Sequence, residues 1–292
     1  MIKHLQQSQC QTRSEGVNLR QIIFLFGANS LAQNVFGIVI VVNVLSLTIA
    51  AFTHGFERYG MRNTIIFFAI TAVVSWILET SSIANGFPFG HYVYADRLGL
   101  KLGTVPLLIL PSYFSMGYFS WTMAHALVQH FQRIMVGNAV VAVPVIGSFL
   151  MVMWDLSIDP VASTISKNWI WTDGGAYFGV PYSNFLGWFL TVYIIFQVFA
   201  LFIARVNTTI LNLPDSRFSW NFAVAMYFIK AITSVLQPLF TVNHLEIYQS
   251  MSLVALFSMT FVAVLTFLNI EAKYKTMLEK TAPISNQISR AQ

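Results

Sequence analysis

The sequence predicts an all-α integral membrane protein with about seven transmembrane helices in one bundle. Its 292 residues are 56% hydrophobic and only 9% charged, whereas soluble domains are about 25% charged. The apolar residues gather in runs of about 20 residues or more, the length that an α-helix needs to cross a bilayer. No Gly/Ser-rich linker divides the chain. We therefore expect one membrane domain at 21–271, between a polar N-terminal tail at 1–20 and a polar C-terminal tail at 272–292.

Seven apolar runs account for the predicted helices. They cover residues 22–52, 64–84, 104–128, 136–156, 184–204, 221–240 and 251–270. The two loops at 85–103 and 157–183 are long and rich in Gly, Pro and aromatic residues, whereas the loops that follow the first, third and fifth runs are short or plain. Alternating spans put the two long loops at one end of the bundle, called here the loop-rich end, and the others at the plain end. Elaborate loops on a rigid scaffold are where function tends to lie.

The positive charge of the chain agrees with a membrane location. The formal net charge is +5, which on a membrane protein indicates cytoplasmic flanking residues rather than nucleic-acid binding. Nine Lys and Arg residues fall at the plain end and six at the loop-rich end. We therefore expect the plain end to face the cytoplasm, and we expect the lipid bilayer but no nucleic acid as a partner.

Cofactor and metal signatures are absent from the sequence. The one cysteine, Cys10, cannot form an internal disulfide or a multi-cysteine metal site. No HxxxH cluster, GxGxxG fingerprint or GxSxG motif occurs. The polar first twenty residues lack the apolar core of a secretory signal peptide. We therefore expect a protein that uses no metal, nicotinamide or flavin.

Three acidic residues lie in or beside apolar runs near the loop-rich end. Glu79 follows the apolar stretch VVSWIL, and Asp155 and Asp159 close the fourth run in WDLSIDPVA. A charge at membrane depth costs about 3 kcal/mol on insertion scales, so it usually has a specific role. A spacing of four residues is one helical turn, so Asp155 and Asp159 share one face if the helix continues through both.

Both structural and catalytic roles are open for these acids. Asp159 could be a carboxylate in water at a helix end before Pro160, and Asp155 and Glu79 could form hydrogen bonds between helices. The catalytic alternative is acid catalysis, because apolar surroundings keep a carboxylic acid protonated near neutral pH. Membrane prenyltransferases hold magnesium diphosphate with two aspartate-rich motifs, but this chain has one such pair and no basic cluster on its long loops.

Aromatic residues concentrate in the two long loops and the helix ends beside them. Trp and Tyr commonly mark membrane interfaces, but Gly174, Gly175 and Gly179 with Pro181 indicate a shaped turn rather than a plain anchor. Aromatic faces also stabilise cations. The candidate substrate-binding residues are Trp154, Trp171, Tyr177, Phe178, Asn184, Phe89, Tyr92, Tyr94 and Trp188.

The order of these motifs resembles a family of membrane proteins of carotenoid biosynthesis, which includes bacterioruberin-type carotenoid hydratases and γ-carotene 1′-hydratases. The resemblance covers residues 76–188. It rests on a Glu at the end of one helix, an FGxYxY loop, a DLxxDP helix end, and then GxYFGVPxxNFxGW.

The resemblance implies cofactor-free hydration of the terminal ψ-end double bond of an acyclic or monocyclic carotenoid, giving a tertiary alcohol. The substrate would belong to the lycopene or γ-carotene class, and other carotenoid-pathway enzymes are expected as partners in a bacterial inner or thylakoid membrane. The residues fit this chemistry. Protonating an isolated alkene needs a poorly solvated acid, and the tertiary cation then needs aromatic faces, a carboxylate and one delivered water.

The acids are expected to meet at one end of the bundle. We expect Glu79, Asp155 and Asp159 to converge there. Trp171, Tyr177 and Phe178 are expected to fold over them. Asp155 is the expected proton donor. Asp159 is expected nearer to water, where it orients or deprotonates the attacking water molecule. Glu79 is the second candidate for the proton donor. Two other classes remain open: a carotenoid or terpene cyclase with the same acid chemistry, and a non-enzymatic carotenoid-binding or transport protein.

Overall fold

The computed structural model describes residues 19–206 and 208–281, and within them the side chains of 37–206 and 208–279. Cys10 and most of the predicted N-terminal tail lie outside these ranges, as does the end of the predicted C-terminal tail. The predicted domain boundaries therefore stay a prediction.

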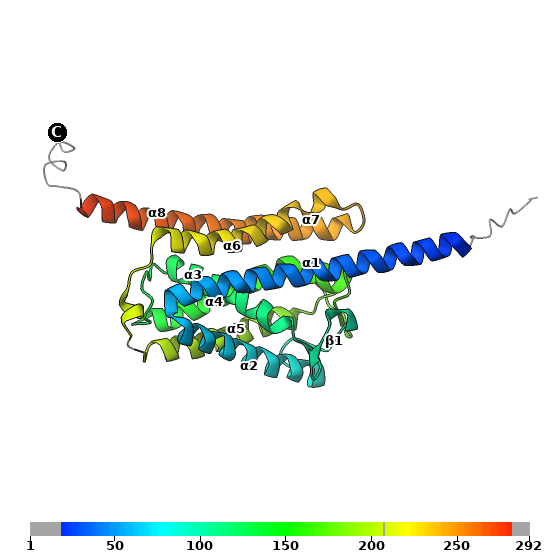
Figure 1. Ribbon diagram of the computed structural model, residues 1–292, viewed down its shortest axis with the longest axis horizontal. Coiled ribbons are helices and arrows are strands. Elements are labelled where there is room, and N and C mark those ends of the chain that lie inside the picture. The colour runs from blue at the N-terminus through cyan, green and yellow to red at the C-terminus, as the bar shows by residue number, and fades with distance from the viewer. Residues whose placement is uncertain (1–18, 207, 282–292) are drawn as a thin grey trace, which may run out of the picture. The chain divides into compact units, whose positions relative to one another are not determined.

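Helices make up most of the described residues (Figure 1). The chain divides into two compact units at residue 41, and helix α1 begins in the first and ends in the second. The α-helices are α1 (Leu19–Tyr59), α2 (Met61–Asn85), α3 (Ile109–Leu127), α4 (Ala139–Asp159), α5 (Tyr182–Ile203), α6 (Arg217–Leu236), α7 (Leu245–Val254) and α8 (Phe261–Thr281). A π-helical segment, Ala255–Thr260, joins α7 to α8 into one continuous helix. Each of the seven predicted runs is thus helical over most of its described length.

Six of these helical segments are long and apolar enough to cross a membrane, counting only the described residues. The chain is therefore an all-α, multi-pass integral membrane protein, as predicted. Helix α3, the third predicted span, is long enough but less apolar than the other six. It also begins later than predicted, because Val105–Pro106 pairs with Lys101–Leu102 in a two-stranded turn, as strands β3 and β2.

Helix α3 is enclosed by other helices, which explains its composition. Fourteen of its residues are buried, and it contacts α2, α4, α6 and α8. A helix surrounded by protein is not required to show lipid an apolar face. Its neighbours pack through aromatic rings: Phe67 of α2 stacks on Phe199 of α5, with ring centroids 4.0 Å apart, and both touch Trp121 of α3.

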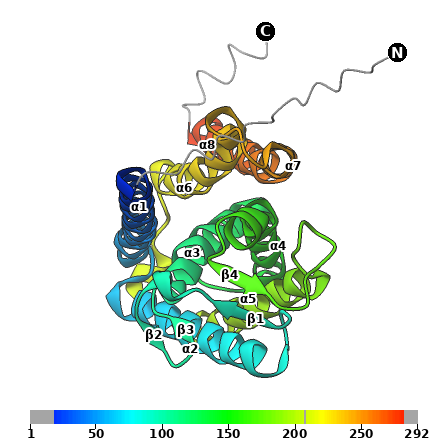
Figure 2. The same ribbon diagram turned by 90° about the vertical axis from the view of Figure 1, so that its right-hand side faces the viewer.

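The two long loops are joined to each other. Strand β1 (Tyr92–Tyr94) pairs antiparallel with strand β4 (Trp169–Trp171), and Figure 2 shows both strands at one end of helices α2 to α5. The Ser183 hydroxyl at the start of α5 donates to the carbonyl of Phe89, at 2.8 Å. The prediction that these loops lie at one end of the bundle is confirmed.

The fourth helix does not stop at Asp159. It continues as a π-helical turn over Pro160–Ile165. Pro160 occupies the first position of that turn, where the missing N–H is tolerated. Single π-helical turns often mark functional sites. The interpretation of Asp159 as an exposed helix-end carboxylate is wrong, since the residue is only 1% exposed.

Candidate active site

Three acids meet at the loop-rich end, from two different helices. Glu79 lies near the end of α2, and Asp155 and Asp159 lie one turn apart at the end of α4. Their exposed fractions are 4%, 1% and 1%. Glu79 is close enough to interact electrostatically with both aspartates. The structure therefore brings together the three acids that the sequence singled out.

One amide bridges the two aspartates. Asn184, in the first turn of α5, is buried, and its Nδ2 donates to Asp155 Oδ2 at 2.9 Å and to Asp159 Oδ2 at 2.7 Å. Helix α5 is placed for this by Pro181, whose extended backbone immediately precedes the helix. The two carboxyl groups thus share a single amide NH₂ group and form one unit.

The two aspartates differ in their other partners. Asp159 Oδ1 also accepts from Trp169 Nε1, at 2.8 Å, whereas Asp155 accepts from Asn184 alone within the described part of the chain. Trp171 lies beside Asp159 as well, with a buried Nε1 that lacks a hydrogen-bond partner of ordinary geometry among the described residues. The sequence-based expectation that Asp159 lies nearer water than Asp155 is wrong.

Glu79 is held by three tyrosines. Tyr92 and Tyr94 both donate to its Oε2, the latter at 2.8 Å, and Tyr113 of α3 donates to Oε1 at 2.7 Å. Tyr92 and Tyr94 are two residues apart on strand β1, so they project from the same side of it. Burial raises the pKa of both strand phenols well above the usual value of 10, which keeps them protonated as donors.

A wall of aromatic rings links Glu79 to Asp155. The Tyr113 ring stacks on Trp188 of α5, with centroids 4.3 Å apart and planes 7° apart. Trp188 meets the edge of Trp154, the residue before Asp155, at 5.9 Å, and it lies 6.3 Å from Phe89. The wall therefore contains three of the predicted substrate-binding residues, Phe89, Trp154 and Trp188.

The loop aromatics divide into two groups. Tyr92 packs against Trp171 with ring centroids 4.8 Å apart, and Tyr94 packs against Trp169 at 6.1 Å, so strands β1 and β4 cover the acids. Tyr177 lies within electrostatic reach of the aspartates, but its hydroxyl donates to the carbonyl of Leu156. Burial raises the pKa of Tyr177 to about 12.

Phe178 makes its contacts away from the acids. Its ring packs on Tyr177, and its carbonyl accepts from the Thr164 hydroxyl at 2.5 Å. Its positive φ of 51° belongs to the turn that the glycines of this loop predicted. The expectation that Trp171, Tyr177 and Phe178 fold over the acids therefore holds for Trp171, which lies beside Asp159, and not for Phe178.

Sequence reasoning missed two residues of the site. Trp169 belonged to the aromatic cluster but was not singled out, and only the β1–β4 pairing brings its N–H to Asp159. Tyr113 was missed because it lies in an apolar run on a different helix from Glu79. A phenol inside such a run needs a partner for its hydroxyl, and this was the available signal.

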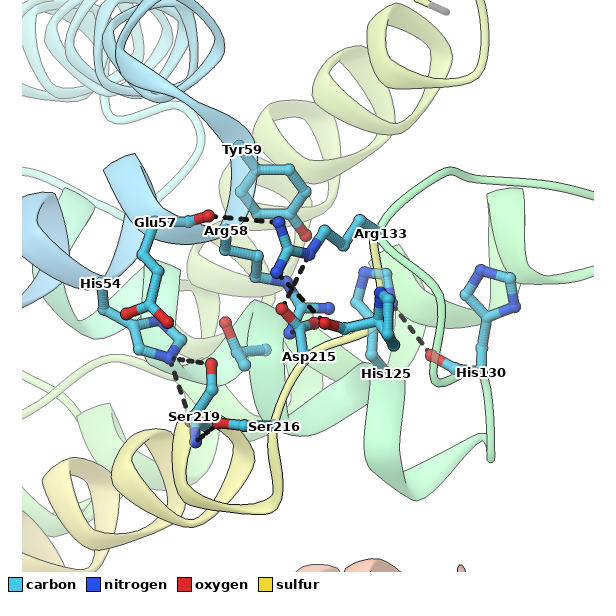
Figure 3. Close-up of polar contacts among 12 residues, drawn as sticks. His54, Glu57, Arg58, Tyr59, His125, His130, Arg133, Asp215, Ser216 and Ser219 are labelled. Atoms are coloured by element: carbon cyan, nitrogen blue, oxygen red, sulfur yellow. Dashed lines mark hydrogen bonds and ion pairs between the residues drawn. The ribbon is translucent and has the colours of Figure 1, made fainter. Parts of the chain in front are cut away.

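A second buried polar cluster lies at the plain end (Figure 3). Asp215 forms ion pairs with Arg58, at 2.7 Å, and with Arg133, at 2.8 Å. Arg133 also donates to the carbonyls of Glu57 and Ile210. These groups are paired with one another and fasten the end of α1 to two loops, which is a structural arrangement rather than a set of free acids and bases.

The fold and site define a multi-pass membrane protein with a buried cluster of three acids walled by aromatic rings. The chain belongs to the carotenoid biosynthesis protein family, whose profile matches residues 35–272. The match includes every predicted site residue and confirms the family resemblance. No curated protein and no solved structure matches the chain. In the described residues no group of three or more His, Cys, Asp or Glu side chains is arranged to hold a metal ion.

Proposed function

We propose that this protein hydrates the terminal ψ-end double bond of an acyclic or monocyclic carotenoid to a tertiary alcohol, without a cofactor. The observation that carries the proposal is the pair of buried carboxyls, Asp155 and Asp159, bridged by Asn184. Membership of the carotenoid biosynthesis family supports a polyene substrate. An extended apolar polyene already lies in the bilayer, so it can reach the bundle laterally.

The paired aspartates suit the transfer of one proton. Two carboxylates this close disfavour double ionisation, so the pair retains one proton. Hydrogen bonds to a carboxylate favour its ionised form. Asp159 accepts from both Asn184 and Trp169 and Asp155 from Asn184, which supports Asp155 as the acid and Asp159 as the carboxylate.

In the proposed reaction these two residues give up one proton and recover one. The proton of Asp155 adds to the CH carbon of the terminal double bond, and positive charge forms on the carbon that bears two methyl groups. A water oxygen bonds to that carbon, and its surplus proton passes to Asp159. The pair regains its proton, and the product contains one more water than the substrate.

The surroundings suit the carbocation. Aromatic faces attract cations, and the contacting rings of Tyr113, Trp188 and Trp154 connect Glu79 to the residue next to Asp155. Glu79, to which three phenols donate, serves as the carboxylate counter-charge. Fixed dipoles and charges of this kind stabilise developing charge most where water is excluded. Trp171 Nε1 is buried beside Asp159 without a hydrogen bond of ordinary geometry among the described residues, so it is available as a donor to the attacking water.

Pigment analysis tests the proposal. The full chain is coexpressed with a pathway that makes lycopene or γ-carotene, and the pigments are analysed by mass. We expect a product heavier by one water. A product of unchanged mass and altered retention would assign a cyclase, in which another double bond captures the cation. Bound but chemically unchanged pigment would assign a carotenoid-binding or transport protein.

A matched pair of variants ties the activity to the site. Asp155→Asn removes the transferable proton while keeping the shape of the side chain, and it should abolish the heavier product. Asp173→Asn alters an exposed aspartate of loop 157–183 and should leave product yield unchanged. Equal yields from the two variants would refute the assignment of the acid.

A further inference from the structure

An open, solvent-accessible cavity of about 540 Å³ lies at the plain end, between the segment that follows α3 and helix α8. Its lining mixes polar and apolar side chains: Gln129, Gln132, Asn269, Lys273 and Thr276 on the polar side, and Phe131, Ala272 and Met277 on the apolar side. The volume falls within the range of small-ligand sites. The amides, the hydroxyl and the ammonium can all donate hydrogen bonds, as an oxyanion requires.

Lys273 is the cation of this cavity. Its Nζ lies 4.1 Å from the centre of the Phe131 ring and 5.7 Å from that of Tyr274. Among the described residues no carboxylate lies within ion-pair distance of it. The ammonium is therefore held by aromatic faces, and its charge is available to an anion in the cavity.

The protein behind the cavity adds positive charge. The Phe131 ring meets Trp220 edge-on, with centroids 5.2 Å apart, and the Arg58 guanidinium lies 4.1 Å from the centre of Trp220. Arg58 and Arg133 share the single carboxylate of Asp215. Lys273 interacts electrostatically with Asp215 and Arg58. Arg58, Arg133 and Lys273 thus share the single carboxylate of Asp215, so these four groups carry a formal surplus of two positive charges.

We propose that this cavity binds a phosphate-bearing anion through Lys273 and the neighbouring amides. Such a group occurs both in the headgroup of an anionic phospholipid and in small soluble phosphates. The cavity opens beside exposed residues of α8, such as Thr276. Basic pockets of membrane proteins on the cytoplasmic side bind anionic lipid headgroups, and the distribution of Lys and Arg predicts that the plain end faces the cytoplasm.

Two lysines on the same helix give a matched test. Lys273 lines the cavity, whereas Lys275, two residues on, is exposed and does not. The full chain is purified in detergent and stripped of lipid, and its thermal unfolding is followed during titration with phosphatidylglycerol in a phosphatidylcholine background. We expect phosphatidylglycerol to stabilise the wild type and Lys275→Gln. Lys273→Gln should need at least about fivefold more, since one lysine near a membrane surface contributes about 1 kcal/mol.

A second titration separates the two sources of phosphate. Inorganic phosphate that stabilises the wild type and not Lys273→Gln would assign a soluble phosphate compound, and an effect of phosphatidylglycerol alone would assign a lipid. Lys273→Arg keeps the charge and should retain binding, which controls for a folding defect in Lys273→Gln. The proposal fails if neither ligand stabilises the wild type, or if both glutamine variants lose binding equally, as a diffuse surface charge would predict.

Discussion

The ring of Tyr113 stacks almost parallel on the ring of Trp188, 4.3 Å away, while its hydroxyl donates to Glu79. One side chain of α3 thereby orients an acid of α2 and an indole of α5. Stacked aromatic pairs contribute about 0.5–1.5 kcal/mol beyond the area they bury. The stack fixes the distance between the Glu79 carboxyl and the aromatic wall.

Tyr113→Phe keeps the ring stack and removes the hydrogen bond to Glu79. A hydrogen bond to a charged group contributes about 1.5–3 kcal/mol, and each 1.4 kcal/mol of barrier changes a rate about tenfold. We expect hydration to slow by about tenfold or more, measured as product formed per unit of membrane protein. Tyr227→Phe is the control, because its hydroxyl donates to the Leu150 carbonyl in α4, away from the acids. Equal losses in both variants would mean that a general loss of packing explains the effect.

Asp155→Asn should lower the rate by at least about a hundredfold, the low end of general-acid contributions. Protein level and carotenoid binding should persist, because the amide occupies the same volume beside Asn184. Glu79→Gln should retain more activity than Asp155→Asn. A lower activity in Glu79→Gln than in Asp155→Asn would make Glu79 the proton donor. Full activity in both variants would mean that these acids have only a structural role.

Gly187→Ala should separate α5 from the loop that precedes β1. A Cβ at Gly187 would lie 2.7 Å from Phe89 Cδ1 and 2.8 Å from the carbonyl oxygen of Pro88, so backbone must move. Overpacking of this kind costs about 1–3 kcal/mol. We expect lower thermal stability and loss of activity. Gly117→Ala, also in a helix, would meet Phe196 at an ordinary 3.5 Å and should unfold at a temperature close to that of the wild type.

Asp215→Asn should destabilise the protein strongly. It leaves Arg58 and Arg133 buried beside each other without their shared carboxylate, and breaking a buried pair in this way costs about 3–5 kcal/mol. The comparison is Arg217→Gln, which breaks the pair with Glu271, whose side chains are 55% and 28% exposed. Such surface pairs contribute about 0–1 kcal/mol. Thermal unfolding in detergent should therefore separate the variants clearly, and similar unfolding temperatures would contradict the structural role of Asp215.

The helices could be predicted because their signal is local. Length and apolar composition alone are enough to predict a membrane-spanning helix. Each of the seven predicted runs is therefore helical in the structure, with helix boundaries that differ from the predicted ones by several residues. The common location of loops 85–103 and 157–183 could also be predicted from the sequence, since it depends only on the alternation of spans. The pairing of Tyr92 with Trp171 could not be predicted, because β-strand register depends on tertiary structure.

The acids were identified, but their surroundings were not. Pro160 was interpreted as a helix end, which put Asp159 in water, yet a proline at the first position of a π-helical turn lets the chain continue. The hydrogen bonds from Asn184 depend on how α5 packs against α4, and those to Glu79 come from three tyrosines in two segments. Contacts between side chains that are brought together only by tertiary packing cannot be predicted from the local sequence around each residue.

The enclosure of α3 has a consequence for biogenesis. A nascent helix is released sideways into the bilayer according to its own apolarity, and α3 is less apolar than the six helices suited to crossing a membrane. Its buried Ser115, Ser120, Thr122 and His125 are tolerated in the folded state because neighbouring helices shield them from lipid. We therefore expect α3 to enter the membrane together with a neighbouring helix that covers its polar residues, such as α4, rather than by itself.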